Sequence, residues 1–168
     1  MTISSTANRI SYAGNASTTA FSFPYLFFAD NDMVVTIKVD STGVETVKTI
    51  STHYTVTGSG VAAGGTVTMG SAPASGETLI LSRSEQLTQT LDLVENDPFP
   101  SSLVEQQFDT LTMITQQLQE EIDRTLRYPI GDTSGLGAEL DSSVTRANKY
   151  LRFDATGAVA LDTLVGNY

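Results

Sequence analysis

Hydrophobic and polar positions divide the chain into three regions with different periods. Up to about residue 98, short β-branched or alternating segments are separated by turn residues. From residue 103 to 127 the apolar residues recur at a helical spacing, and from residue 130 onward the pattern loosens. This order predicts a mainly β fold, in which a β domain is followed by one long helix and a loosely patterned C-terminal segment.

The first region predicts a small antiparallel β-sandwich. Its expected strands are residues 33–39, 44–50, 54–57, 65–69 and 77–84. Polar or Gly/Pro-rich turns at 40–43, 58–64 and 72–76 separate them, and the first pair indicates a hairpin. Short strands at about ten-residue spacing are typical of a sandwich or barrel. Residues 1–100 are therefore interpreted as one β domain.

The period changes after Asp97-Pro98-Phe99-Pro100, where two prolines end any strand or helix entering from upstream. The next residues match a capping box, with Ser102 as the N-cap and Glu105 at N3. Neither Gly nor Pro interrupts residues 103–127. The pattern therefore predicts a helix within residues 101–128. Its apolar positions have a mean spacing of about 3.7 residues and are Val104, Phe108, Leu111, Ile114, Leu118, Ile122 and Leu126.

A helix of this length has two interpretations. It spans roughly 37 Å, which is more than a β domain of this size can cover. Its apolar stripe could pack across the sandwich, or it could associate with copies of itself in a parallel bundle. The Gln-rich flanks favour the bundle, and a spacing near 3.7 favours a nearly straight or weakly right-handed one. Burial of eight side chains would contribute on the order of 10 kcal/mol per chain before ordering costs; they are Leu103, Val104, Phe108, Leu111, Ile114, Leu118, Ile122 and Leu126.

Residues 129–168 are expected to form a linker and a β-hairpin. The segment 131–137 is rich in Gly and is interpreted as the linker, and 138–149 is weakly helical. Strands are predicted at 150–154 and 158–161 around a turn at 155–157. An isolated hairpin is marginal in water, so this one would need a neighbouring copy or further sequence.

Composition excludes several classes of function. The chain has 168 residues, a net charge of −10, one His and no Cys. It therefore has neither disulfides nor thiolate chemistry, and the acidic balance argues against binding nucleic acid. The N-terminus does not resemble a secretory signal, and the longest apolar run, 23–29, is too short to cross a bilayer. We expect a soluble protein made in the cytoplasm, with no membrane insertion.

Candidate chemistry is sparse, and no catalytic, cofactor-binding or metal-binding residue is predicted. His53 could act as a general base, but no nucleophile is paired with it, and a His in a turn or at a strand end is the favoured interpretation. The glycines within 58–65 fit a hairpin loop better than a phosphate cradle. Asp92, Glu95 and Asp97 match no calcium-loop spacing and are expected in a solvated connector. Arg83 could pair with one of these acids.

One aromatic cluster supports a second class of function. Tyr25, Phe27 and Phe28 could form a platform for sugars, which would make the chain a carbohydrate-binding or polysaccharide-depolymerising module. The alternative is that these rings belong to the core of the sandwich.

The order of several short motifs resembles a known family. They are Tyr12-Ala13-Gly14, the run 19–26 from Thr19 to Leu26, Met33-Val34-Val35, His53-Tyr54-Thr55-Val56, the run 72–77 from Ala72 to Glu77, the run 79–83 from Leu79 to Arg83, and Ser101-Ser102-Leu103 before a Gln-rich helix. In this order they resemble the N-terminal virion-anchoring domain of tail fibre and tailspike proteins from short-tailed phages, the T7-like fibre group. The resemblance covers roughly residues 8–128.

The resemblance implies a structural virion protein without enzymatic activity. Its β domain, residues 1–100, would attach to the phage tail or an adaptor protein, and residues 101–128 would gather three chains. Residues 129–168 would begin a fibre shaft used in host adhesion. The chain would then be either a short fibre or adaptor that carries a distal or receptor-binding protein, or the ordered part of a longer fibre. It would be located in the virion tail after assembly in the host cytoplasm.

Overall fold

The computed structural model describes Ile3 and residues 5–89, 91–95, 98–125, 131, 149–153, 155 and 159–163. The chain divides into two compact units, Met1–Arg124 and Thr125–Tyr168. Thus the β strands of the first region and the long helix belong to one unit, whereas the sequence pattern separates them at residue 100.

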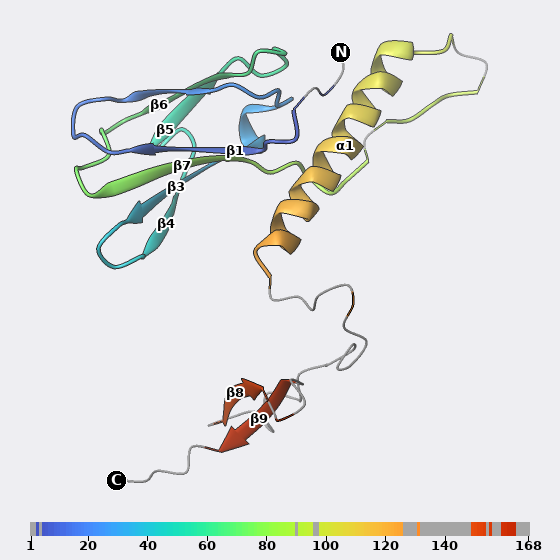
Figure 1. The fold of residues 1–168 in the computed structure, drawn as a ribbon. Helices are drawn as coiled ribbons and strands as arrows, with labels where there is room; N and C mark the ends of the chain where they lie inside the picture. Colours follow the sequence, from blue (N-terminus) through green and yellow to red (C-terminus); the bar gives the residue numbers. More distant parts are fainter. Residues whose placement is uncertain are drawn as a thin grey trace, which may run out of the picture. The chain divides into compact units, whose positions relative to one another are not determined.

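The first unit contains two antiparallel sheets and one helix (Figure 1). The four-stranded sheet has the order β1-β7-β3-β4 and the three-stranded sheet the order β2-β6-β5. The strand bounds are β1 Arg9–Ala13, β2 Ala20–Phe23, β3 Met33–Val39, β4 Glu45–Lys48, β5 Tyr54–Thr57, β6 Gly65–Met69 and β7 Glu77–Arg83. We call these seven strands and their loops the β domain.

Most predicted strands are confirmed, and two strands were missed. The strand bounds of β3, β5 and β6 match the prediction, and β3 pairs with β4 as the expected hairpin. The missed strands are β1 and β2, of which β1 pairs with β7 and β2 with β6. β1 alternates half-buried with exposed residues, so its local pattern is weak, and β2 alternates exposed with buried residues but is only four residues long. These segments become strands because they pair with β7 and β6, which lie far away in the sequence.

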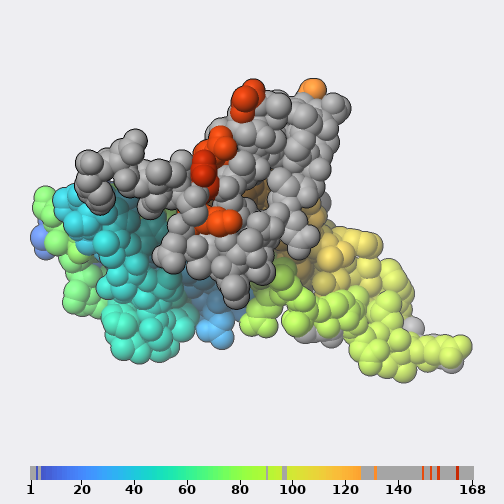
Figure 2. Space-filling model, turned by 90° about the horizontal axis from the view of Figure 1, so that it is seen from below, coloured from blue at the N-terminus to red at the C-terminus, as the bar shows by residue number. Residues whose placement is uncertain are grey.

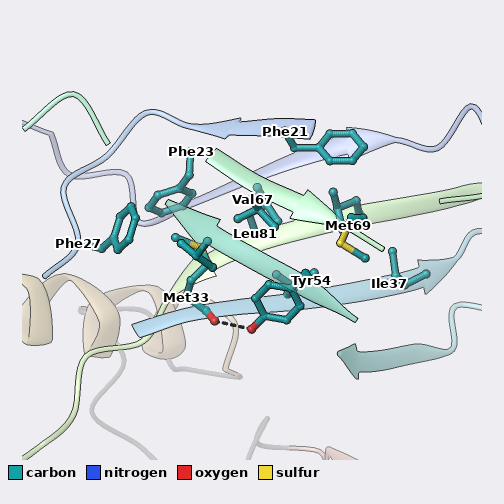
Figure 3. Packing of buried hydrophobic residues seen from close by; sticks show 12 residues of the cluster. Phe21, Phe23, Phe27, Met33, Ile37, Tyr54, Val67, Met69 and Leu81 are labelled. Atoms are coloured by element: carbon teal, nitrogen blue, oxygen red, sulfur yellow. Dashed lines mark hydrogen bonds between the residues drawn. The ribbon is translucent and has the colours of Figure 1, made fainter. Parts of the chain in front are cut away.

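Both sheets turn alternate side chains into one shared core (Figure 3). The burial pattern of β5 shows the period: Tyr54 and Val56 are buried, whereas Thr55 and Thr57 are exposed. Threonine suits such strands because its β-branched side chain favours extended backbone and its hydroxyl is satisfied on the wet face. The Tyr54 hydroxyl donates a 2.8 Å hydrogen bond to the Met33 carbonyl, which satisfies its polar end inside the core.

The long helix, α1, spans Ser101–Asp123. The predicted capping box is wrong: Ser102 lies within the first turn, Pro100 is the N-cap, and that end has no side-chain cap. Proline at the N-cap supplies no side-chain acceptor, and the N–H groups of Leu103 and Val104 donate instead to the Pro100 carbonyl. The C-terminal end of the predicted helix at 126–128 lies outside the described residues.

The second unit contains a two-stranded antiparallel sheet, β8 (Lys149–Phe153) and β9 (Val159–Thr163). The predicted hairpin strands are thereby confirmed, with β8 starting and β9 ending slightly beyond the expected bounds. The predicted linker and weak helix fall on residues 131–149, most of which lie outside the described residues.

Candidate oligomerisation interface on the long helix

α1 runs beside the segment that precedes β1 and past the end of β7 (Figure 1), and one of its faces bonds to both. The Ile3 N–H donates to Asp109 Oδ1 at 3.3 Å, and Gln116 Nε2 donates to the Ser5 carbonyl at 2.9 Å. Further along, Arg9 Nη1 lies 3.1 Å from Glu120 Oε1. Ile3 and Ser5 of this segment, and Arg9 at the start of β1, therefore contact α1 at three successive levels along its axis.

A second attachment, which we call the joint, links α1 to the end of β7. Arg83 Nη2 donates to Gln116 Oε1 at 2.8 Å, and the Glu85 N–H donates to Gln117 Oε1 at 2.9 Å. Arg83 also donates from Nη1 to the Leu26 carbonyl at 2.7 Å. Two adjacent glutamines thus fix the helix to a buried arginine and to the backbone two residues beyond it. The residues of this docked face are Asp109, Met113, Gln116, Gln117 and Glu120.

The docked face is mainly polar, with one apolar member. Met113 is fully buried, and Asp109 is only 6% exposed. Because the glutamines and acids of this face bond to backbone and to arginines, the face does not resemble the apolar stripe that the sequence pattern highlights.

The apolar stripe of α1 is exposed. Phe108, Leu111, Leu118 and Ile122 have exposed fractions of 46–65%, and Val104 is half-buried. At 3.6 residues per turn these five positions lie about 190° around the helix from the docked face. The interpretation in which this stripe packs across the sandwich is therefore wrong: α1 contacts the N-terminal segment, the start of β1 and the end of β7, and it does so through its opposite face.

The remaining predicted interface residues lie beside the stripe or outside the described part. Leu103 is exposed, Ile114 is half-buried, and Leu126 lies outside the described residues. We use "stripe" below for Val104, Phe108, Leu111, Leu118 and Ile122. An exposed apolar row of this length on a helix is typical of a surface that is covered in an assembly.

The connector between β7 and α1 lies beside the first half of the helix. Figure 2 shows its side chains, in yellow-green, next to those of α1 at one edge of the first unit. Leu91 and Asp92 line one groove together with Leu103 and Gln107 of α1. The connector therefore covers one flank of α1 and leaves the stripe exposed.

The joint contains three buried ionisable groups: Asp32, Arg83 and Glu85, each at most 6% exposed. Arg83 Nε lies 3.8 Å from Glu85 Oε1, and this oxygen has no hydrogen-bond partner in the described part of the chain. Burial, together with the nearby Asp32 carboxylate, raises the pKa of Glu85 to about 7 although Arg83 opposes the shift. Burial also raises the pKa of Asp32 and lowers that of Arg83.

The sequence pattern missed the joint for a physical reason. Gln116, Gln117 and Glu120 lie opposite the apolar stripe, where polar residues are usually solvated, so the pattern gives no sign that they bond to the β domain. The pattern also suggests that Arg83 could pair with Asp92, Glu95 or Asp97. Asp92 and Glu95 are exposed, Asp97 lies outside the described residues, and Arg83 lies against Glu85. The sequence feature that comes closest to indicating the joint is the presence of Arg83 and Glu85 at the end of an alternating strand, and this feature alone does not indicate burial.

The other candidate sites are accounted for by the fold. His53 lies in the turn before β5, as the favoured interpretation expects, and its Nδ1 accepts the Thr49 N–H at 3.1 Å. The glycine-rich loop joins β5 to β6, and a Cβ on Gly64 would lie 1.9 Å from the Phe23 carbonyl oxygen. These glycines therefore allow close backbone packing. Within the described ranges, no group of His, Asp and Glu could hold a metal ion.

The proposed sugar platform is not assembled as one exposed surface. Phe27 is fully buried in the core, where its ring lies edge-on to that of Phe23 at 6.0 Å (Figure 3). Tyr25 is partly buried against the same cluster, and Phe28 is half-buried. For Phe27 the core interpretation is confirmed. No helix among the described residues is long and apolar enough to cross a membrane.

Comparison with known proteins relates the chain to a component of phage tails. It is 36% identical over 129 residues to the tail spike protein of Salmonella phage epsilon15, an alignment that covers 77% of this chain and 12% of that protein. The chain thus matches only about an eighth of the length of this curated relative. No protein-family model matches the chain. The similarity supports a phage tail structural protein located in the virion tail.

Proposed function

We propose that this chain attaches a trimeric fibre or spike to the phage tail. In this proposal the β domain is a sandwich that binds the tail or an adaptor protein, and α1 gathers three chains through its stripe. The hairpin β8–β9 begins the shaft. The chain carries out no reaction and takes no cofactor. The observation that carries the proposal is the exposed stripe of α1 on a helix already docked through its opposite face.

The stripe suits parallel association of identical chains. Its members, from Val104 to Ile122, are separated by four, three, seven and four residues. The interval of seven contains Thr115, which occupies the one core position of the heptad pattern that is not apolar. A heptad repeat favours a left-handed supercoil instead of the nearly straight bundle that the longer apolar list predicts. In a parallel pairing in register, Gln107 lies opposite Thr112, and Ile114 lies opposite Gln119, so these flanks bring no like charges together. The number three comes from the resemblance to tail fibres.

The arrangement places each β domain outside the bundle. Since the docked face lies opposite the stripe, three chains that meet through their stripes would hold their β domains around the helices, directed outward. The surfaces of the β domains are then available to a tail protein. The alternative of a carbohydrate-binding or depolymerising module has no structural observation in its favour, because the aromatic cluster contributes Phe27 to the core.

Two measurements test the proposal. Sedimentation should give a trimer at micromolar concentration, and Leu118→Asp should shift it toward monomer. The purified chain should also bind phage tails that lack their fibres, and an excess of it should block addition of the complete fibre. A wild-type chain that sediments as a monomer would contradict the trimer, and tails that bind none of it would contradict the attachment role.

A further inference from the structure

The joint beneath α1 contains an unequal set of charges. Asp32 and Glu85 each carry one negative charge when ionised, and Arg83 carries one positive charge. All three side chains are buried. When both acids are ionised the buried set has a net charge of −1, and when one acid binds a proton the set is neutral. Burial of an uncompensated charge is costly, so this set is most stable with one proton bound.

The geometry selects Glu85 as the acid that holds the proton. Asp32 Oδ2 accepts the Ala29 N–H at 2.7 Å, a contact that favours its ionised form. By contrast, Glu85 Oε1 lies 3.8 Å from Arg83 Nε and has no hydrogen-bond donor in the described part. Lack of a donor to this buried oxygen destabilises the ionised carboxylate much more than the neutral carboxyl group.

The helix supplies no compensating charge at this point. The residues of α1 that contact Arg83 and Glu85 are Gln116 and Gln117, and both offer their amide oxygens. The preceding segment contributes Asn8, whose carbonyl accepts the Arg83 N–H. The charged groups around the adjacent groove are Arg9, Glu45, Glu120, Glu121 and Arg124, and two of these, Arg9 and Arg124, already form ion pairs with Glu120. Asp109 of the docked face accepts the Ile3 N–H.

We propose that protonation of Glu85 controls how firmly α1 is held on the β domain, so that the joint is closed while Glu85 is neutral and loosens when it ionises. An ionised Glu85 competes for Arg83, which otherwise donates to Gln116 Oε1, and it draws water into the contact with Gln117. Loosening the joint changes the freedom of the β domain relative to the helix without touching the stripe, which lies on the opposite face. The inference rests on the proposed function only in treating α1 as the axis of an assembly.

The consequence for a fibre is a pH-dependent anchor. With the joint closed, each β domain has a fixed direction relative to α1. With the joint open, Ser5 of the N-terminal segment still bonds to Gln116, and Arg9 at the start of β1 still pairs with Glu120, so the β domain stays attached while it reorients about these contacts. The pKa of Glu85, about 7, puts this change within the range of neutral solutions.

Distance measurements between spin labels test this device in the complete chain. Because the chain has no Cys, Ser11→Cys on β1 and Gln106→Cys on α1 give two unique labelling sites, and both positions are exposed. Labelled chains are diluted with unlabelled ones so that each assembly holds one labelled copy. The distance distribution should be narrow at about pH 5.5 and broad at about pH 8.5, on either side of the expected midpoint.

Glu85→Gln should keep the distribution narrow at both pH values, whereas the matched control Glu45→Gln, an exposed acid on β4, should behave as the wild type. A wild-type distribution that does not change with pH, or a Glu85→Gln variant that retains the change, would overturn the inference. Sedimentation of the same samples tests trimer formation independently of the label distances. A trimer at both pH values supports the proposed role of the stripe, whatever the labels show about the joint.

A direct titration covers the case in which Glu85→Gln does not fold. The carboxyl carbon of Glu85 in the wild-type chain should titrate by NMR with a midpoint near pH 7, compared with an ordinary value of 4.5. A midpoint at the ordinary value would overturn the inference.

Discussion

Phe108 and Asp109 are consecutive residues of α1 with opposite environments: Phe108 is 65% exposed, whereas Asp109 is only 6% exposed. The carboxylate of Asp109 accepts a hydrogen bond from the Ile3 N–H, so the N-terminal segment covers the polar side of the helix. This inversion of the usual arrangement is typical of a helix whose apolar side is covered in an assembly.

Charge placed in the stripe should prevent assembly. Phe108→Asp and Leu118→Asp each remove apolar burial worth ~2 kcal/mol per chain and would place a carboxylate in the bundle. Both variants should sediment as monomers, and their melting temperatures should lose the concentration dependence expected of the wild type. Gln106→Asp is the matched control, because Gln106 is exposed on a different side of α1. Trimeric Phe108→Asp would contradict the assignment of the stripe.

Loss of the buried guanidinium should destabilise the first unit. Arg83→Met leaves the Leu26 carbonyl and Gln116 Oε1 without this donor and leaves Asp32 and Glu85 without a cation. The free energy of unfolding should fall by ~3 kcal/mol in urea denaturation. Arg9→Met is the control, because the pair of Arg9 with Glu120 is exposed and should contribute less than ~1 kcal/mol. Equal losses in the two variants would show that Arg83 has no special role.

The pH dependence of stability should carry the signature of Glu85. Its pKa is about 7 in the folded chain against an ordinary 4.5. A pKa raised by folding means that the folded state binds more protons between these values, so stability falls as the pH rises through this window. The contribution is on the order of 3 kcal/mol, present in full below about pH 4.5 and lost above about pH 7.

Urea denaturation as a function of pH can isolate this contribution by comparing the wild type with Glu85→Gln. The difference between their unfolding free energies should change across the window and be constant outside it. A difference independent of pH would exclude Glu85 as the group responsible.

A methyl group at Gly65 should disturb the pairing of β5 with β6. Its Cβ would lie 1.9 Å from the Thr57 carbonyl oxygen and 2.9 Å from Cζ of Phe27. Gly65→Ala should therefore cost ~3 kcal/mol in unfolding free energy through overpacking. Gly60 has a positive φ of 74° and open space around it, so Gly60→Ala should cost only ~1 kcal/mol of backbone strain. If Gly60→Ala costs more than Gly65→Ala in thermal or urea denaturation, the close contact is not limiting.

The limits of the helix show where local reasoning fails. Uninterrupted helical periodicity placed α1 correctly, because periodicity depends only on residues within the same segment. The capping box at Ser102 and Glu105 was wrong because two serines precede the apolar run, and the helix begins at the first, directly after Pro100. The boundary of a helix depends on a few hydrogen bonds at its end, and neighbouring residues can serve equally well as its first residue.

The sequence by itself determined the strands β3 to β7, the presence and length scale of α1, the C-terminal hairpin strands and the position of the apolar stripe. Each follows from periodicity and turn chemistry within a short segment. Only the tertiary structure decided that α1 docks through Asp109, Met113 and its glutamines, that Arg83 and Glu85 are buried beneath it, and that β1 and β2 complete the sheets. These features join residues far apart in the chain, and burial of a polar side chain depends on whether distant partners satisfy it.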